Sequence, residues 1–101
     1  MLDRNLYSGL IRLHILHHAA EGPVFGQRMI DELGHHGYRL SAGTLYPILH
    51  GMERQGYLRS QQTLNAGRQR RVYRATPAGR KALVIARQRV QEMFGEMFEQ
   101  D

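Results

Sequence analysis

The sequence predicts a mainly α-helical fold in which three helices and a β-hairpin precede one long final helix. Three observations support this order. Apolar residues recur at helical spacing in four segments, an extended stretch with a glycine-containing turn separates the third segment from the fourth, and 101 residues provide one modest hydrophobic core. We expect two parts, residues 1–75 and residues 76–101, with the second formed by the final helix.

Residues 3–21 are expected to form the first helix, because Asp3 is a suitable N-cap and apolar side chains recur along one face. Gly22 and Pro23 end this helix. A second, short helix is expected to open at Gly26 and to end before Gly34.

Ser41 is the expected cap of a third helix, whose apolar stripe ends before Gly56. The stripe consists of Leu45, Ile48, Leu49 and Met52. Pro47 is well tolerated only in the first turn of a helix, so this helix is expected to begin near Thr44 or to bend.

A β-hairpin is expected next, with strands at residues 57–64 and 69–75 around a glycine-containing turn at 65–67. Thr76 followed by Pro77 then provides an N-cap and a proline at the first helical position. The final helix is expected to run to about Gln100, which makes it roughly 37 Å long.

This element order is typical of a winged helix-turn-helix, in which the second helix of the turn enters the major groove of double-stranded DNA. The residues expected to contact bases or phosphates lie at the entry or on the outer face of the third helix: Ser41, Ala42, Thr44, Tyr46, Pro47 and His50. For Tyr46, packing of the ring half inside the core is an equally good interpretation.

Basic residues gather in the predicted hairpin. Five arginines, Arg59, Arg68, Arg70, Arg71 and Arg74, fall within sixteen positions, in a chain whose net charge is +5 and whose only lysine is Lys81. Arg68, Arg70 and Arg71 are the expected phosphate contacts. Because strand residues alternate between two faces, we expect one arginine of the set to be structural. The alternative is that the run is only a solvated surface.

An a/d-type seam runs along the final helix and predicts a homodimer. It consists of Leu83, Ala86, Val90, Met93 and Met97, widened by Phe94 and Phe98. A two-fold pair would place two reading helices about 34 Å apart over a palindromic operator. Two alternatives remain: the stripe packs on the first helix of its own chain, or it binds a different protein as an interaction module.

Catalysis and metal binding are not expected. Cysteine is absent, which excludes disulfides and thiolate ligands, and no serine elbow or carboxylate pair is present. His14 with His17 or His18, and the pair His35 and His36, have suitable spacing for metal ligands, but no carboxylate was found at matching helical spacing. We therefore expect no metal and no cofactor, and keep a histidine-based metal-responsive regulator as an alternative.

With no apolar run of about 20 residues and no signal peptide, the protein is expected in the cytoplasm, away from membranes.

Two segments of the sequence resemble the PadR family of transcriptional regulators. Residues 40–49 (LSAGTLYPIL) with 52–58 (MERQGYL) resemble its recognition helix, and residues 67–80 (GRQRRVYRATPAGR) resemble its wing and the start of its dimerisation helix. With Glu21, Gly22, Pro23 and Gly26, the resemblance spans nearly the whole chain.

This resemblance implies a transcriptional regulator, usually a repressor, of the short subfamily with one C-terminal helix. It also implies release of DNA by a small, often aromatic effector near the dimer interface. Met93, Phe94, Met97 and Phe98 would line its pocket with first-helix residues opposite, and the alternative is that these four residues are only dimer core. The chain departs from the family pattern at Gln27, where tyrosine is common, and at His50 and Gly51. It also has no tryptophan in the last helix, which disfavours a pocket for flat drugs.

Overall fold

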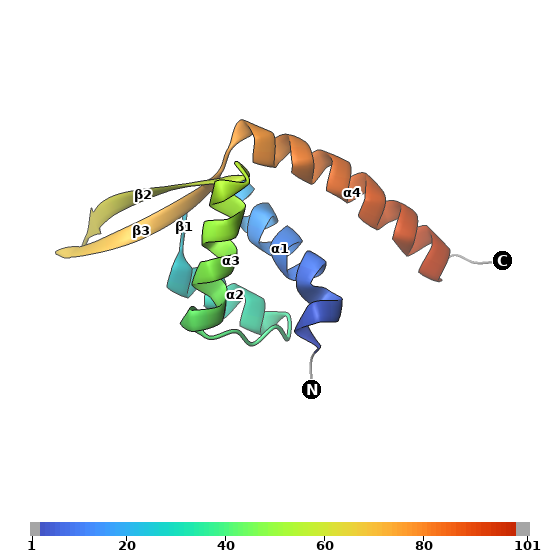
Figure 1. The fold of residues 1–101 in the computed structure, drawn as a ribbon, viewed down its shortest axis with the longest axis horizontal. Helices are drawn as coiled ribbons and strands as arrows, with labels where there is room; N and C mark the ends of the chain where they lie inside the picture. Colours follow the sequence, from blue (N-terminus) through green and yellow to red (C-terminus); the bar gives the residue numbers. More distant parts are fainter. Residues whose placement is uncertain (1–2, 99–101) are drawn as a thin grey trace.

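A computed structural model, which describes residues 3–98, confirms the predicted winged helix-turn-helix and long final helix. Its elements are α1 (Arg4–Glu21), β1 (Val24–Phe25), α2 (Gly26–His35), α3 (Ala42–Arg54), β2 (Leu58–Asn65), β3 (Arg68–Ala75) and α4 (Pro77–Phe98). Three helices form the body, the β2–β3 wing projects from one side, and α4 extends away on the other (Figure 1). The predicted continuation of the last helix to Gln100 lies outside the described residues.

The first two helices begin where the sequence predicts. The Asp3 carboxylate caps α1 by accepting hydrogen bonds from the backbone N–H groups of Asn5 and Leu6. β1 was not predicted, because two residues are too few to show a periodic pattern. It forms only because Val24 and Phe25 lie against the free edge of β3, opposite Tyr73 and Val72.

The sequence predicted that α3 begins near Thr44 or bends at Pro47, and the first of these alternatives is wrong. The helix begins at Ala42, after Ser41, whose hydroxyl accepts a hydrogen bond from the Thr44 N–H at 3.3 Å. Pro47 is therefore the sixth helical residue, where its missing N–H leaves the Gly43 carbonyl without its i+4 donor. Burial of the apolar side of the helix, which includes Leu45 and Leu49, offsets this cost.

The three strands form an antiparallel sheet in the order β1-β3-β2. The turn between β2 and β3 consists of Ala66 and Gly67, with φ angles of 54° and 77°. Two successive positive φ values are typical of the tight hairpin turns that match the twist of a sheet, and glycine is suited to the second position. The wing is therefore a regular two-stranded ribbon beyond the short β1.

Buried side chains from all three body helices meet those at the base of the wing in one core. Its largest fully buried side chains are Ile11, Ile15, Met29, Leu33, Leu45, Leu49, Leu58 and Tyr73. The core holds α3 by its apolar side, which leaves the opposite side of this helix on the surface.

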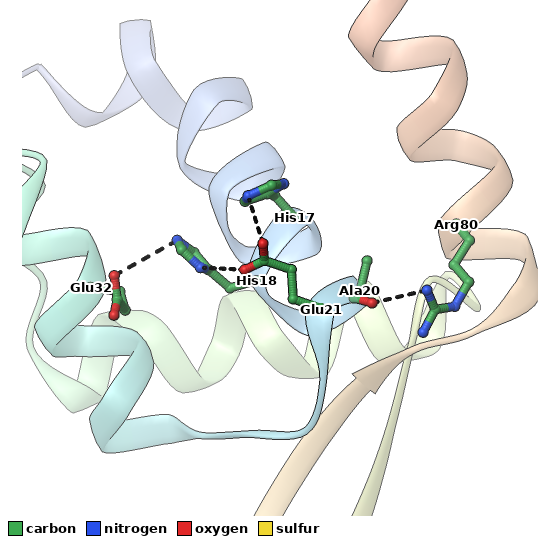
Figure 2. Close-up of polar contacts among 6 residues, drawn as sticks. All are labelled: His17, His18, Ala20, Glu21, Glu32 and Arg80. Carbon is green, nitrogen blue, oxygen red and sulfur yellow. Dashed lines mark hydrogen bonds and ion pairs between the residues drawn. The ribbon is translucent and has the colours of Figure 1, made fainter.

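The start of α4 is attached to the body at several points. The Thr76 hydroxyl accepts a hydrogen bond from the Gly79 N–H and donates one to the Gly56 carbonyl. A Cβ atom on Gly79 would overlap the carbonyl oxygen of Tyr57, so only glycine allows this close approach. In addition, Arg80 Nη1 donates to the Ala20 carbonyl at 2.9 Å, at the end of α1 (Figure 2). The direction of α4 is thus set by its first turn.

Candidate nucleic-acid interface

The outer side of α3 presents a stripe of small and polar residues. Of the residues that the sequence suggested, Ser41, Ala42, Pro47 and His50 are exposed, whereas Thr44 and Tyr46 are half-buried. Two further exposed positions on the same helix, Gly43 and Arg54, were not singled out. Gly43, Pro47, His50 and Arg54 follow one another at helical spacing and form one continuous face.

Arg4 lies at the entry to this face, although it is 40 positions from Thr44 in the sequence. Its Nη1 donates a hydrogen bond to the Thr44 hydroxyl at 3.0 Å, and the Ser41 hydroxyl donates to the same oxygen at 3.3 Å. Sequence patterns gave no signal for this contact, because it depends on how α1 packs beside α3. The contact adds a positive charge to the N-terminal end of α3.

The Tyr46 ring joins the periphery of the core rather than standing free in solvent. Its phenol lies over Gly26, where a Cβ atom would overlap the ring. On the outer side, the Tyr46 ring centroid lies 6.3 Å from that of His50. Tyr46 therefore connects the start of α2 to the exposed face of α3, and Gly26 is required by that contact.

A groove of about 460 Å³ lies between α2, α3 and the wing. Its lining residues are Phe25, Gly26, Gln27, Tyr46, Arg68, Gln69, Arg70 and Arg71. Four of the residues suggested by the sequence thus meet in one place: Tyr46 and the three wing arginines. Gln27, at the start of α2, was noted only as a departure from the family pattern.

The wing arginines divide unequally between the two faces of the sheet. In the β2–β3 register, Arg59 pairs with Arg74, Thr63 with Arg70, and Asn65 with Arg68. Residues paired across two strands lie on the same face of a sheet, as do residues of one strand that are an even number of positions apart. Arg59, Arg68, Arg70 and Arg74 therefore share one face, and Arg71 lies on the other. The Arg70 guanidinium lies 5.2 Å from the centroid of the Phe25 ring, a distance suited to a cation–π contact.

Arg71 contributes to a chain of hydrogen bonds that holds the wing to α3. Its Nη1 donates to the Ser60 hydroxyl at 2.9 Å, and that hydroxyl donates to Glu53 Oε2 at 2.7 Å. The Ser60 N–H donates to the same carboxylate oxygen at 3.2 Å. Arg71 therefore has a structural contact in addition to its place in the groove.

Tyr73, at the base of the wing, has a side chain that is almost completely buried. Its hydroxyl has no hydrogen-bond partner among the described residues. Burial raises the pKa of this phenol, with Glu53 and Tyr46 adding to the effect and Arg71 opposing it. The Tyr73 side chain therefore stays neutral at physiological pH and serves the core.

The seam of α4 divides into two parts. Leu83 and Ala86 are half-buried beside α1, and with Val90 they line a groove of about 360 Å³ whose other walls are Leu10, Leu13, His14, His17 and Arg87. Farther along α4, the apolar side chains are exposed: Val90 46%, Met93 56%, Phe94 50%, Met97 58% and Phe98 68%. The seam thus packs on its own chain near the body and lies open beyond it.

The exposed part of α4 makes the molecule elongated. Its extents are 57 × 33 × 22 Å, and its radius of gyration is 14.7 Å, against about 13 Å for a compact chain of this length. Val84, Ile85 and Leu6, which the sequence analysis did not assign to an interface, are also exposed.

Within residues 3–98, no helix is both long enough and apolar enough to cross a membrane.

Histidines of α1 lie beside His36, which follows the end of α2, and two of them, His14 and His17, also line the groove between α1 and α4. The His14 ring centroid is 4.5 Å from that of His36 and 6.4 Å from that of His18. Burial lowers the pKa of His14, and the neighbouring His36, His18 and His17 lower it further.

The statement that no carboxylate has matching helical spacing is wrong. Glu21 follows His17 by four positions and His18 by three, and its oxygens lie 3.6 Å and 3.7 Å from their ring nitrogens (Figure 2). Glu32 of α2 is the second carboxylate beside His18, at 4.0 Å.

Comparison with known proteins identifies relatives along most of the chain. The family model described as Transcriptional regulator PadR-like family matches residues 15–85. Transcriptional regulator Rv3488 of Mycobacterium tuberculosis is 52% identical over 94 residues, which cover 93% of this chain and 88% of that protein.

Solved structures of similar proteins share the fold. A PadR family transcriptional regulator from Eggerthella lenta is 30% identical, with a TM-score of 0.74 and coverage of 96% of this chain and 88% of the other. A PadR-like transcriptional regulator from Bacillus cereus has a TM-score of 0.81 at 22% identity, with coverage of 96% and 99%, and supports the fold alone.

Proposed function

Because this chain belongs to the PadR-like family of transcriptional regulators, we propose that it is a homodimeric repressor that binds a palindromic operator in double-stranded DNA. The observation that carries this proposal is the continuity of one surface. The exposed side of α3 adjoins a groove lined by three wing arginines, so a helix that fits the major groove lies beside cations that fit the phosphate backbone.

Within this surface, different residues have different roles. Ser41, Ala42 and Thr44, at the entry to α3, and Pro47 and His50, on its outer side, approach the base edges and nearby phosphates. Tyr46 contributes the wall of the groove and shapes the approach of the backbone. Arg68 and Arg70 bind phosphates, and Arg71 combines a phosphate contact with support of the wing.

The dimer is formed by α4, so that residues 76–101 are the dimerisation part and residues 1–75 bind DNA. The interface includes Leu83, Ala86, Val90, Met93, Phe94, Met97 and Phe98. Exposure of large apolar side chains over the outer half of a helix is unfavourable in water, and a second α4 would cover them. A two-fold pair also provides two reading helices for the two half-sites of an operator.

A small aromatic effector would bind among Met93, Phe94, Met97 and Phe98. The Phe94 and Phe98 rings, whose centroids lie 4.9 Å apart at a tilt of 44°, and the flexible methionine side chains provide an apolar surface for a small aromatic molecule. Because α4 is attached to the body by its first turn, a change at the interface would alter the spacing of the two α3 helices. Release of DNA would follow from the loss of fit to the operator.

Selection of bound sites from random oligonucleotides by the purified protein tests this proposal. The expected result is a palindrome whose half-sites are centred about one helical turn apart, roughly 34 Å. The variant His50→Ala should change the preferred bases, whereas Arg89→Ala, an exposed position on α4, should leave them unchanged. Recovery of no preferred site, or a protein that light scattering shows to be a monomer, would favour an interaction module instead.

A further inference from the structure

The geometry points to a metal site that the proposed function does not use: we propose that His14, His18 and His36 hold one divalent transition-metal ion of the zinc, nickel or copper class. Each of these residues offers a ring nitrogen, and the three atoms lie within 4.8 Å of one another. A single ion at ordinary metal–nitrogen distances of about 2 Å can therefore reach all three with small side-chain adjustments.

The three histidines come from two elements with well-defined backbones. His14 and His18 are four residues apart and lie on the same side of α1. His36 is the C-cap of α2, and its backbone N–H donates to the Leu33 carbonyl at 3.1 Å. The Tyr38 N–H donates to the same carbonyl at 2.9 Å, so the turn that carries His36 is held on both sides. An ion at this site would connect α1 to the turn that leads into α3.

The two nitrogens of the His18 ring have different surroundings. Nδ1 faces Glu21 at 3.7 Å, whereas Nε2 is buried and has no hydrogen-bond partner among the described residues. Glu32 lies 4.0 Å from Nε2, which is beyond hydrogen-bond distance. Metal-bound histidines commonly direct the other ring nitrogen to a carboxylate, and Glu21, whose oxygen lies 3.7 Å from Nδ1, would take that role after a small shift of its side chain (Figure 2).

The ligand atoms select the class of ion. Imidazole nitrogens suit zinc, copper, nickel and iron, whereas magnesium and calcium require oxygen ligands. Aromatic packing also limits the movement of the His14 ring, whose centroid lies 5.4 Å from that of Tyr38.

A second group, His17, His18 and Glu21, also lies within 4.8 Å, but it is the weaker candidate. All three belong to α1, and the side chains of His17 and Glu21 are 55% and 65% exposed. Ion binding there would immobilise two exposed side chains and would not link α1 to any other element. The two groups share His18 but differ in their other members. Metal binding at the first group requires His36 and not His17, whereas binding at the second requires His17 and not His36.

Zinc titration of the chelator-treated full-length protein by calorimetry, without DNA, tests the proposal. The expected stoichiometry is one zinc per chain, and His36→Gln should weaken binding at least tenfold. The matched control is His35→Gln, which changes the neighbouring histidine outside the cluster, and a second control is His17→Gln. Both controls should bind zinc as the unchanged protein does.

Cobalt provides a second readout, because visible absorption of Co²⁺ reports the coordination geometry. The unchanged protein should give the intense bands of a four-coordinate site with three histidine nitrogens and one water, and His14→Gln should lose them while its far-UV circular dichroism stays the same. No zinc binding at 100 µM, half a zinc per chain, or a loss of binding in His17→Gln but not in His36→Gln would each overturn the proposal. None of these measurements depends on DNA binding, so failure of the metal site and failure of the repressor function are distinguishable.

Discussion

The Tyr73 hydroxyl is one of two buried side-chain polar groups that have no hydrogen-bond partner among residues 3–98, the other being His18 Nε2. A buried polar atom that loses its bonds to water costs about 1–3 kcal/mol, and phenylalanine fills the same volume without that cost. We expect Tyr73→Phe to raise the free energy of unfolding by about 1 kcal/mol, measured by urea unfolding at a fixed protein concentration.

Tyr57→Phe is the matched control, because Tyr57 is 36% exposed and its hydroxyl has access to water. This change should leave the free energy of unfolding nearly the same. A loss of stability in Tyr73→Phe would mean that the hydroxyl is bonded through water, and would contradict the interpretation.

Single residues also show where a glycine is required by contact rather than by backbone angle. At Gly79 a side chain would overlap the Tyr57 carbonyl, and at Gly26 it would overlap the Tyr46 ring. Sequence comparison with the PadR family drew attention to both glycines, but it gave no reason for them. The reason is that Gly79 closely approaches Tyr57 and Gly26 closely approaches Tyr46, although the two members of each pair are far apart in the sequence.

At the scale of elements, the wing combines a structural and a DNA-binding function, and the sequence predicted one structural arginine without indicating which one. Arg71 is hydrogen-bonded through Ser60 to α3, whereas Arg68 is exposed beside the turn. Each phosphate contact contributes about 0.9 to the slope of log K against log salt concentration. We therefore expect Arg68→Ala to reduce the magnitude of that slope by about 0.9 at an operator, measured by fluorescence anisotropy.

Arg71→Ala should differ from Arg68→Ala in one respect: it should also lower the melting temperature, because it removes the hydrogen bond to Ser60. Arg89→Ala, on exposed α4, removes the same charge away from the wing and should alter neither quantity. An unchanged salt slope in Arg68→Ala would show that this arginine makes no phosphate contact.

α3 illustrates how tertiary packing overrides local preference. Pro47 and Gly51 both disfavour a helix, and they led to the incorrect start near Thr44. The helix forms nevertheless, since Leu45, Leu49 and Met52 are buried in the core.

For the whole molecule, the open seam of α4 predicts that assembly depends on its outer half. Phe94 is 50% exposed in the single chain, and a second α4 would bury it. Burial of a carboxylate without a partner is strongly unfavourable, so Phe94→Glu should convert the dimer into a monomer. Sedimentation or light scattering at about 50 µM protein would show this change.

Gln88→Glu is the control for charge, because Gln88 is exposed and lies about 200° around the helix from Val90. It should remain a dimer. Operator affinity should fall in Phe94→Glu and stay the same in Gln88→Glu, because two half-sites are bound together only by a dimer. A dimeric Phe94→Glu protein would place the interface elsewhere.

The order of the elements was predictable because it depends on local signals. Caps at Asp3, Ser41 and Thr76, and the glycine turn of the hairpin, act within a few residues of their own position. Helical spacing likewise identified the faces of α3 and α4. The family was recognised from two short segments for the same reason, since each is continuous in the sequence.

Contacts between distant segments were decided only by the tertiary structure. The pairing of Arg4 with Thr44, the hydrogen bond from Arg71 to Ser60, and the meeting of His36 with His14 all depend on how finished elements pack. Local patterns specify which side of a helix or strand is apolar, but many different packings of the elements would bury those same sides. Only the combined packing of the core selects one arrangement, and with it the neighbours of each polar side chain.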